Sequence, residues 1–457
     1  MPDDQQETPV ADRDSSDGER QDTQDEPCDK PGKHDDEVAE AAQEPEPLGR
    51  ESSEPPPAEL HPGGGLAGVL RSWLAGVAPP ARAHLLVGLG LPSLIALFNL
   101  WRMRHFTVDD AYISYRYADK FAQGLGLVYN AGERIEGYTN FSWTVILGLG
   151  IKIGLGPDLV AKTLGSVFAL ASLALCYHLT SAMRPFKLLP CVATWLLATS
   201  MPFIGYAVFG LETPLFIFLV LMGTLLFTRE EKAEGWTFPW SGVVFGLAGL
   251  TRPEAPMYLG LLMLFLGGRG LIPADGIFGP QAKDDDARPF AVLSALLLLV
   301  TVMLVRLKVP RLATPFSVVS YLLLAAGAVV LLSQIPRALF GKRNLLRGTL
   351  FVAPIAMHVL WRKNYYGSYL PNTFTAKTGD LRQQFAGGLD YVSQFLKHDG
   401  VVLYLVLFGL GYALVRKQRL ALAMTATVGV GTGYVILIGG DWMPLFRFMA
   451  PIVPFAF

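Results

Sequence analysis

Cysteine and charged residues are both scarce in this chain of 457 residues. Its three cysteines, Cys28, Cys176 and Cys191, are too few and too scattered for a disulfide framework, and no C-x-x-C pair suggests a zinc or redox site. Only 17% of the residues are charged, against about 25% in an ordinary soluble domain. The composition therefore disfavours a disulfide-rich scaffold and an ordinary soluble enzyme.

The few charges are unevenly distributed along the chain. Residues 1–60 contain 20 acidic and 5 basic side chains, whereas the remainder contains 19 acidic and 33 basic ones. The acidic part has almost no large apolar residues, so it cannot bury enough surface to offset its ordering entropy. Residues 1–83 are therefore predicted to be a disordered acidic tail and linker. A regulatory, partner-binding tail and a merely solvated one are both compatible with this composition.

Long apolar runs follow from about residue 84, many of them close to the roughly 20 residues that cross a bilayer as a helix. Because open strands cannot satisfy their backbone groups in lipid, these runs predict helices. We expect an all-α polytopic membrane protein with about 10–12 transmembrane or interfacial helices. The expected spans lie near 84–101, 141–156, 159–183, 188–208, 212–228, 240–267, 290–306, 315–333, 348–361, 401–415 and 420–438, with a last apolar stretch from 448.

Lysine and arginine in short loops indicate how the spans are oriented. We assign the N-terminal tail and five basic loops to the cytoplasm of a bacterial inner membrane, the loops lying at 184–187, 229–232, 269, 337–347 and 416–419. The segments expected on the periplasmic or outer face are then 102–140, 210–212, 252–254, 362–400 and 440–442.

Two regions conflict with a simple alternation of spans. The runs 141–156 and 159–183 cannot both cross fully if the later assignments hold, so one of them is expected to be interfacial or re-entrant. The run 240–267 is interrupted by Thr251-Arg252-Pro253-Glu254. Because proline disfavours a continuing helix, we expect two short helices that meet on the outer side.

The first outer loop contains the richest polar stretch, which begins at Asp109-Asp110. Its pattern predicts a helix over 110–122 at the membrane surface, with Asp109 or Asp110 as the N-terminal cap and Gly124 just beyond its end. Its tyrosines suit the interface, where amphipathic rings concentrate. The two aspartates are thus either helix caps or functional groups.

Ionisable and amide side chains recur close to apolar boundaries in every outward segment. Such groups are costly at a membrane edge unless they pair or serve a site. Their grouping on one side predicts a shared outer cavity, although each could also be an ordinary interfacial ion pair. The residues concerned are Asp109, Asp110, Glu212, Arg252, Glu254, Asn372, Lys377, Asp441 and Arg447.

Several motifs in a fixed order resemble a family of GT-C-type membrane glycosyltransferases, which includes the mycobacterial terminal arabinofuranosyltransferase and flagellar motor-control proteins. The most specific block runs from Asp109-Asp110-Ala-Tyr through Gly-Leu-Val-Tyr-Asn to Glu136-Gly-Tyr138-Thr-Asn140. The later motifs are Gly210-Leu-Glu-Thr-Pro, Thr251-Arg-Pro-Glu, Tyr365-Tyr-Gly, Pro371-Asn-Thr, and Gly440-Asp441 with Arg447. The resemblance covers roughly 84–457 and implies a GT-C-like transmembrane domain there.

The resemblance implies transfer of a sugar, with a pentofuranose as one candidate, from a polyprenyl-phosphate donor to a glycan or lipid acceptor on the outer face. A polyprenyl phosphate leaves without much acid help, so one carboxylate base and a few cations are sufficient. Asp109 or Asp110 would be the base. The candidate phosphate ligands are Arg252, Lys377, Arg447 and Arg116. The candidate ligands of sugar or acceptor are Glu212, Asn372, Asp441, Glu136, Tyr138 and Asn140.

No cofactor is required by this chemistry. A divalent metal on the two aspartates is conceivable, but no histidine or third carboxylate nearby supports it. The expected partners are the polyprenyl-phosphate-linked sugar, its acceptor and membrane lipids. Nucleic acid is not expected, because the basic residues follow the spans as topology signals.

Two other functions remain open at the level of sequence. A secondary transporter would place ionisable residues near mid-membrane within a repeated half-structure, and neither feature is evident here. A non-catalytic assembly or motor-control factor is compatible with the flagellar relatives, because fold does not fix function. Loss of activity on replacing the aspartates would separate a transferase from an assembly factor.

Overall fold

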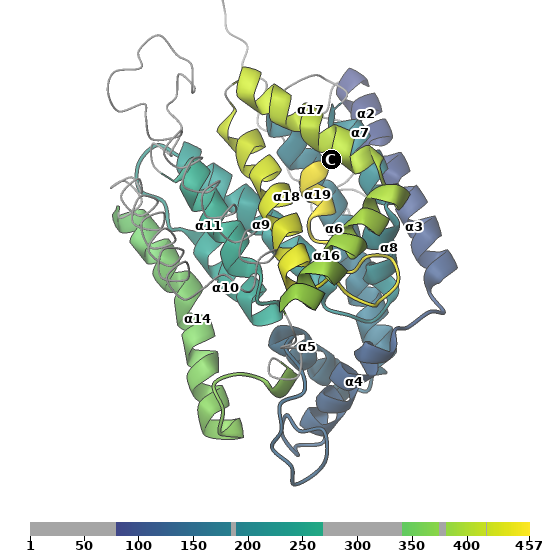
Figure 1. Ribbon diagram of the computed structural model, residues 1–457, viewed down its shortest axis with the longest axis vertical. Coiled ribbons are helices and arrows are strands. Elements are labelled where there is room, and N and C mark those ends of the chain that lie inside the picture. The colour runs from purple at the N-terminus through teal and green to yellow at the C-terminus, as the bar shows by residue number, and fades with distance from the viewer. Residues whose placement is uncertain (1–78, 184–188, 268–340, 374–380, 417) are drawn as a thin grey trace, which may run out of the picture. The chain divides into compact units, whose positions relative to one another are not determined.

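The computed structural model describes residues 79–183, 189–267, 341–373, 381–416 and 418–457. Every element within these ranges is a helix, which confirms the all-α prediction. In chain order (Figure 1) they are α2 (Pro79–Leu85), the π-helix η1 (Leu86–Gly90), α3 (Leu91–Met103), α4 (Asp109–Ala122), α5 (Phe141–Lys152), α6 (Pro157–Met183), α7 (Leu189–Thr199), α8 (Met201–Val208), α9 (Thr213–Lys232), α10 (Trp240–Thr251), α11 (Ala255–Leu266), α14 (Lys342–Tyr366), α16 (Leu381–His398), α17 (Val401–Val415), α18 (Arg419–Ile438) and α19 (Val453–Ala456).

Five helical segments in the described ranges are long and apolar enough to cross a membrane. They are Ala81–Met103, Pro157–Ser181, Thr213–Lys232, Lys342–Tyr366 and Arg419–Ile438. Two bent pairs raise the number to as many as seven: α7 with α8 at 55°, and α16 with α17 at 92°. The chain is therefore a multi-pass membrane protein. The spans expected near 290–306 and 315–333, and residues 1–78 of the expected tail, lie outside the described residues.

The two regions that conflicted with simple alternation have a structural explanation. Helix α5 has 12 residues and is about 18 Å long, which is too short for a hydrocarbon core of about 30 Å. The run 141–156 is therefore not a full span, whereas Pro157–Ser181 qualifies as one. The run 240–267 forms two short helices, α10 and α11, which meet at residues 252–254 as expected.

Three expected loops are corrected by the structure, and one of them, 229–232, forms the last turn of α9. Helix α14 starts at Lys342, so Arg347, expected in a basic loop, lies within it and is fully buried. Arg347 pairs with Glu230 at 3.1 Å and Glu231 at 2.9 Å, and such pairing allows a charge to be buried. The segment 362–400 is not one loop, because it contains the last turn of α14 and the amphipathic helix α16.

Glycines allow α10 to lie close to α14. A Cβ at Gly242 would come 2.5 Å from the carbonyl oxygen of Arg347, and one at Gly246 would come 2.8 Å from Pro354. Because these glycines are four residues apart, they lie on one face of α10, as in the small-xxx-small pattern of membrane helix pairs. This contact fixes the helix that ends at Arg252.

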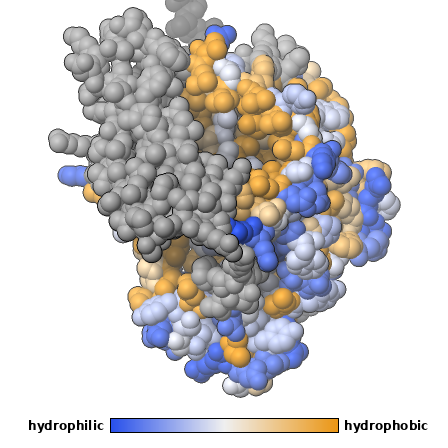
Figure 2. Space-filling model, in the orientation of Figure 1, coloured by the Kyte–Doolittle hydropathy of each residue, from blue (hydrophilic) through white to orange (hydrophobic). Residues whose placement is uncertain are grey.

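Helix α16 packs against the end of α18 and turns sharply into α17 (Figure 1). The buried Gly388 permits this close crossing, because a side chain there would collide with the backbone of Ile436. Leu403, Leu407 and Phe408 of α17 are exposed on the surface of the protein, as suits contact with lipid. Figure 2 shows apolar side chains gathered over the upper part of the molecule and hydrophilic ones more numerous at its lower end.

Candidate functional site

The paired aspartates lie in the first turn of α4. The helix begins after Val108, which is the N-cap residue, so neither aspartate is the cap that was expected. Asp109 is exposed, and its Oδ1 accepts a hydrogen bond from the Asp110 amide at 2.9 Å. The predicted helix is confirmed as α4, its place at the membrane surface stays a prediction, and Gly124 follows its C-cap with φ of +80°. Both carboxylates lie at the N-terminal end of α4, where the positive end of the helix dipole stabilises a negative charge.

Asp110 is brought beside two other predicted site residues from the far end of the sequence. Nη1 of Arg447 lies 3.5 Å from Oδ2 of Asp110, and Nε of Arg447 lies 2.6 Å from Oδ2 of Asp441. The Asp110 side chain is 35% exposed, whereas those of Arg447 and Asp441 are only 10% and 6% exposed. An accessible carboxylate, a cation and a buried carboxylate thus meet, and we call these three residues the Asp110 cluster.

The loop that carries Asp441 and Arg447 has an unusual backbone. Gly439 and Gly440 have φ values of +91° and +72°, and Leu445 and Phe446 also have positive φ, at 58° and 52°. Positive φ in consecutive residues with side chains is strained, and such strain concentrates at functional sites. A Cβ at Gly440 would come 2.6 Å from Cβ of Tyr391 in α16. Helix α16 therefore determines where this loop lies.

Replacing Gly440 by alanine is expected to destabilise the protein by about 2 kcal/mol, because it combines left-handed strain with a steric overlap. Gly132→Ala is a matched control, since Gly132 has φ of +87° but nothing within 4 Å of a Cβ. Thermal unfolding in detergent measures both variants. An equal fall in melting temperature would show that the contact with Tyr391 does not hold the loop.

A second cluster lies where α10 meets α11. Nη1 of Arg252 lies 3.2 Å from Oε1 of Glu212, and Nη2 lies 2.8 Å from Oε1 of Glu254. All three side chains are at most 10% exposed. Burial would raise the pKa of the Glu254 carboxyl, but the Arg252 guanidinium outweighs burial and holds the pKa below its ordinary value of 4.5. Arg252 is thus paired with two carboxylates, and we call this group the Arg252 cluster.

Asn140 connects the Arg252 cluster to α4. Its Nδ2 donates to Oε2 of Glu212 at 2.9 Å and lies 3.0 Å from Oγ of Ser114. Its Oδ1 accepts from Oγ1 of Thr144 at 3.0 Å. Asn140 is only 6% exposed. Its amide therefore fixes Glu212 relative to the helix that carries Asp110.

A tight turn before Glu212 completes this arrangement. Gly210 has φ of +92°, and a Cβ there would come 2.8 Å from that of Ala111 in α4. The Gly210 carbonyl accepts a hydrogen bond from Nε1 of the fully buried Trp143 at 3.0 Å. Only glycine suits both the left-handed conformation and this close approach.

Phe448 joins the two clusters. Its ring centroid lies 5.5 Å from Cζ of Arg252 and 5.0 Å from Cζ of Arg447. Both distances are within the range of a cation–π interaction. The Phe448 amide is in turn held by the Tyr391 hydroxyl at 3.2 Å. The two arginines therefore occupy one continuous site.

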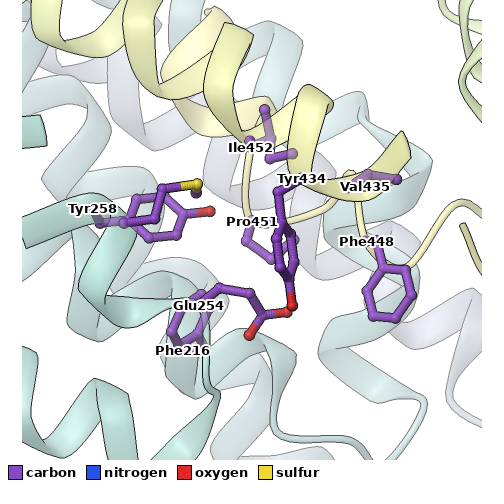
Figure 3. A pocket seen from close by; sticks show the side chains of 10 residues that line it. Phe216, Glu254, Tyr258, Tyr434, Val435, Phe448, Pro451 and Ile452 are labelled. Atoms are coloured by element: carbon purple, nitrogen blue, oxygen red, sulfur yellow. The ribbon is translucent and has the colours of Figure 1, made fainter. Parts of the chain in front are cut away.

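A small pocket adjoins this site between α11, α18 and the C-terminal segment. Figure 3 shows the Glu254 carboxylate and the Tyr434 hydroxyl directed toward each other, with Phe448 to one side. Most of the remaining wall is apolar, and it is formed by Phe216, Met257, Tyr258, Gly431, Val435, Pro451 and Ile452. The pocket thus shares Glu254 with the Arg252 cluster, and it shares Phe448 with the contact between the two arginines.

Glu136 and Tyr138 lie in a third group, at the end of α14. Oε2 of Glu136 lies 2.7 Å from Nε of Arg362, and the hydroxyls of Tyr138 and Tyr366 are 3.3 Å apart. Burial raises the pKa of the Glu136 carboxyl despite the opposing effect of Arg362. The Glu136 carbonyl accepts a hydrogen bond from the Asn372 amide at 3.1 Å. These contacts tie the segment between α4 and α5 to the end of α14.

The other predicted site residues are differently placed. Arg116 is exposed and donates from Nε to the carbonyl of Tyr129 at 3.1 Å, and it forms no ion pair within the described ranges. Asn372 is exposed, and Lys377 lies outside the described residues. In the described ranges no three His, Cys, Asp or Glu side chains are arranged to hold a metal ion.

Sequence reasoning gave no role to Glu254, Phe448 or Arg362. Glu254 was identified as a charged neighbour of Arg252, and two buried acids around one arginine became evident only from the fold. Phe448 has no charge to signal it, although it directly follows Arg447. Arg362 was hidden because its segment was expected to be a loop.

Comparison with known proteins gives one curated relative and several solved structures. No family model matches the chain. The chain is 26% identical over 411 residues to the terminal β-(1→2)-arabinofuranosyltransferase of Mycobacterium tuberculosis, a match that covers 80% of this chain and 55% of that enzyme. The chain thus spans about half the length of the curated relative it matches. The likeness to that enzyme, inferred from the motifs, is confirmed, and the likeness to flagellar proteins stays a prediction.

Solved structures that resemble this chain include those of an oligosaccharyltransferase of Archaeoglobus fulgidus. Its complex with an inhibitory peptide and a dolichol-phosphate has a TM-score of 0.45 and 13% identity, over 82% of this chain and 50% of that one. Its complex with zinc and sulfate has a TM-score of 0.41 and 14% identity, over 81% of this chain and 48% of that one.

Proposed function

We propose that this chain transfers a sugar from a polyprenyl-phosphate donor to a hydroxyl of an envelope glycan or lipid, on the outer face of the inner membrane. The observation that carries the proposal is the Asp110 cluster, in which an accessible carboxylate lies 3.5 Å from a largely buried guanidinium. A base and a phosphate ligand are the two groups that this reaction needs most. The curated relative, an arabinofuranosyltransferase, supports the same reaction class with a pentofuranose as the sugar.

In the proposed step, the acceptor oxygen attacks the anomeric carbon of the donor. The bond between that carbon and the phosphate oxygen breaks, and the polyprenyl phosphate leaves with the bonding electrons. The acceptor proton passes to the Asp110 carboxylate, which is therefore the general base. The exposed Asp109 is the weaker candidate, because Oδ1 of its carboxylate is engaged by the Asp110 amide.

Of the arginines, Arg447 is the better candidate for binding the donor phosphate. Arg252 is already paired with two carboxylates and is buried, so a phosphate would have to displace one of them. Arg447 has one close partner, Asp441, and a longer contact with Asp110. Binding of the phosphate at Arg447 would release Asp110 to face the acceptor. We assign Arg252, Glu212 and Asn140 to positioning.

Donor binding tests the role of Arg447. The full chain in neutral-lipid nanodiscs would be titrated with polyprenyl-phosphoryl arabinofuranose. Arg447→Gln is expected to weaken binding about ten- to a hundredfold, because one charge-assisted hydrogen-bonding group is lost. Arg447→Lys should retain part of the affinity, because it keeps the charge but not the planar fork.

Arg104→Gln provides the matched control, since Arg104 is exposed at the end of α3 and contacts only that helix. Its affinity for the donor should equal that of the wild type. Equal affinity in Arg447→Gln would remove this residue from the donor site. Transfer of the label to an octyl arabinofuranosyl disaccharide, followed in the same samples, distinguishes a transferase from a transporter or an assembly factor.

A further inference from the structure

A group of basic residues and tyrosines covers the middle of α4, the loop after it and the end of α14. Arg116 lies over the ring of Tyr129 at 5.8 Å, and Arg134 lies over Tyr365 at 4.9 Å. Nζ of Lys363 lies over the ring of Tyr369 at 5.1 Å. We call these three pairs the cation–tyrosine patch, which none of the proposed transfer chemistry uses.

The three pairs form one surface, because the loop is fastened to α14. The Tyr366 hydroxyl donates to the Leu127 carbonyl at 2.6 Å, and Nη1 of Arg362 donates to the Tyr369 carbonyl at 3.3 Å. A Cβ at Gly126 would collide with the hydroxyl of Tyr365. The loop and the last turn of α14 are therefore in direct contact.

The cations of the patch are available to an anion. All three basic residues are exposed, and within the described ranges none of them forms an ion pair. Of the nearby acids, Glu136 pairs with Arg362, whereas Glu133 keeps its charge and accepts a hydrogen bond from the side-chain amide of Asn130 at 3.1 Å. Three positive charges beside the one carboxylate of Glu133 leave this surface positive, and it attracts a negatively charged partner.

Apolar side chains are exposed beside these cations. Leu125, Ile135 and Leu370 are 48%, 51% and 52% exposed, and Tyr369 is 55% exposed. Isolated aliphatic residues on a surface need no explanation, but aliphatic residues, tyrosines and unpaired cations together are typical of segments that lie in a membrane interface.

The length of α14 places the patch at the right height. Its 25 residues extend about 37 Å, which exceeds the hydrocarbon core by about 7 Å. The last turn, with Tyr365 and Tyr366, would therefore enter the layer of lipid headgroups, where tyrosine is enriched.

We propose that the cation–tyrosine patch is an interfacial anchor for anionic lipid. Arg116, Arg134 and Lys363 bind headgroup phosphates. Leu125, Ile135 and Leu370 enter the boundary with the acyl chains. The anchor holds the loop after α4, and with it Asp110, at a fixed height above the bilayer. This inference goes beyond the proposed transfer and does not depend on it.

Depth measurement by spin labelling tests the anchor in the full chain. A nitroxide would be placed at Ile135→Cys in a background with Cys28, Cys176 and Cys191 replaced by serine. Accessibility to oxygen and to a nickel chelate would be compared in vesicles with one quarter phosphatidylglycerol. Labels at Leu407→Cys and Glu234→Cys, both exposed in the structure, give the lipid and water references.

The ratio of oxygen to nickel-chelate accessibility measured at Ile135→Cys is expected to be close to that of the lipid reference, Leu407→Cys. In Arg116→Gln/Arg134→Gln/Lys363→Gln the ratio of inserted to free loop should fall about a hundredfold, because each basic residue at an anionic surface contributes about fivefold. Arg102→Gln/Arg104→Gln removes two similar cation–aromatic pairs on α3 and should leave the depth unchanged. One molar salt should reduce insertion as the triple variant does.

Two results would overturn the anchor. One is that the label at Ile135→Cys in anionic vesicles has the accessibility of the water reference. The other is that the triple variant inserts the loop as well as the wild type does. An acidic glycan is the competing partner for such a surface. A label that stays in water and becomes immobilised only when an oligogalacturonate is added would assign the patch to a glycan instead. Melting temperatures show whether the triple variant is folded, and its exposed positions give no reason for misfolding.

Discussion

Replacing Asp110 by asparagine is expected to lower the rate of sugar transfer by at least about a hundredfold, because an amide cannot accept the acceptor's proton. Donor binding should persist, since Arg447 keeps its shorter contact with Asp441 at 2.6 Å. The rate would be measured as label passing from polyprenyl-phosphoryl arabinofuranose to an octyl arabinofuranosyl disaccharide. The melting temperature should change little, because the Asp110 side chain is partly exposed and its contact with Arg447 is long.

Asp109→Asn is the control for this experiment, because it removes a charge one residue away in the same helical turn. Its transfer rate should remain within a few-fold of the wild type. A large loss in Asp109→Asn with normal transfer in Asp110→Asn would exchange the two roles. Normal transfer in both variants would exclude a carboxylate base on α4, while absence of transfer by the wild-type chain would point to an assembly factor.

Replacing Arg252 by glutamine is expected to destabilise the protein by about 3–5 kcal/mol, which is the usual cost of breaking a buried ion pair from one side. Glu212 and Glu254 would both lose their cationic partner while remaining about nine-tenths buried. Unfolding in detergent, followed by circular dichroism, measures the effect. The exposed Arg104→Gln serves as the control and should change the stability by less than about 0.5 kcal/mol.

Near pH 4.5, the stability of Arg252→Gln should change with pH in the opposite direction to that of the wild type. In the wild type the pKa of Glu254 is lowered below 4.5, so the stability it contributes is present above that value and is lost as pH falls below it. Without Arg252, burial would raise the same pKa, and the variant should gain stability as pH falls from neutral toward 4.5. Parallel pH profiles would show that Arg252 does not control the ionisation of Glu254.

The fold was predictable where the pattern is local and strong. The surface helix α4 follows from its polar-aromatic sequence and the glycine after it, and the break between α10 and α11 follows from Pro253. The segment 362–400 was misread because its polar residues suggest a loop. An amphipathic helix such as α16 becomes evident only when its apolar face has a partner, here the end of α18.

The site was only partly predictable, because charge reveals which residues are costly but not how they pair. Asp110, Asp441 and Arg447 were proposed for one cavity, and the structure brings them together. Arg252 was also proposed, with an ordinary ion pair to Glu254 as the alternative, but its second buried partner, Glu212, was not foreseen because it is 40 residues away. The role of Arg347 was missed for a similar reason. Its sequence neighbours suggest a loop, whereas its actual partners are the acids at the end of α9.

The chain of contacts from Ser114 through Asn140 and Glu212 to Arg252 has a consequence for how this protein can change over evolutionary time. Asn140, Glu212 and Arg252 each contact two polar neighbours, so a single substitution leaves a buried polar group without its partner. Neutral drift through these positions would need two coordinated replacements, which arise far less often than one. Exposed positions that take part in no such chain of buried polar contacts are under no joint constraint and can change one at a time while the inner framework stays the same.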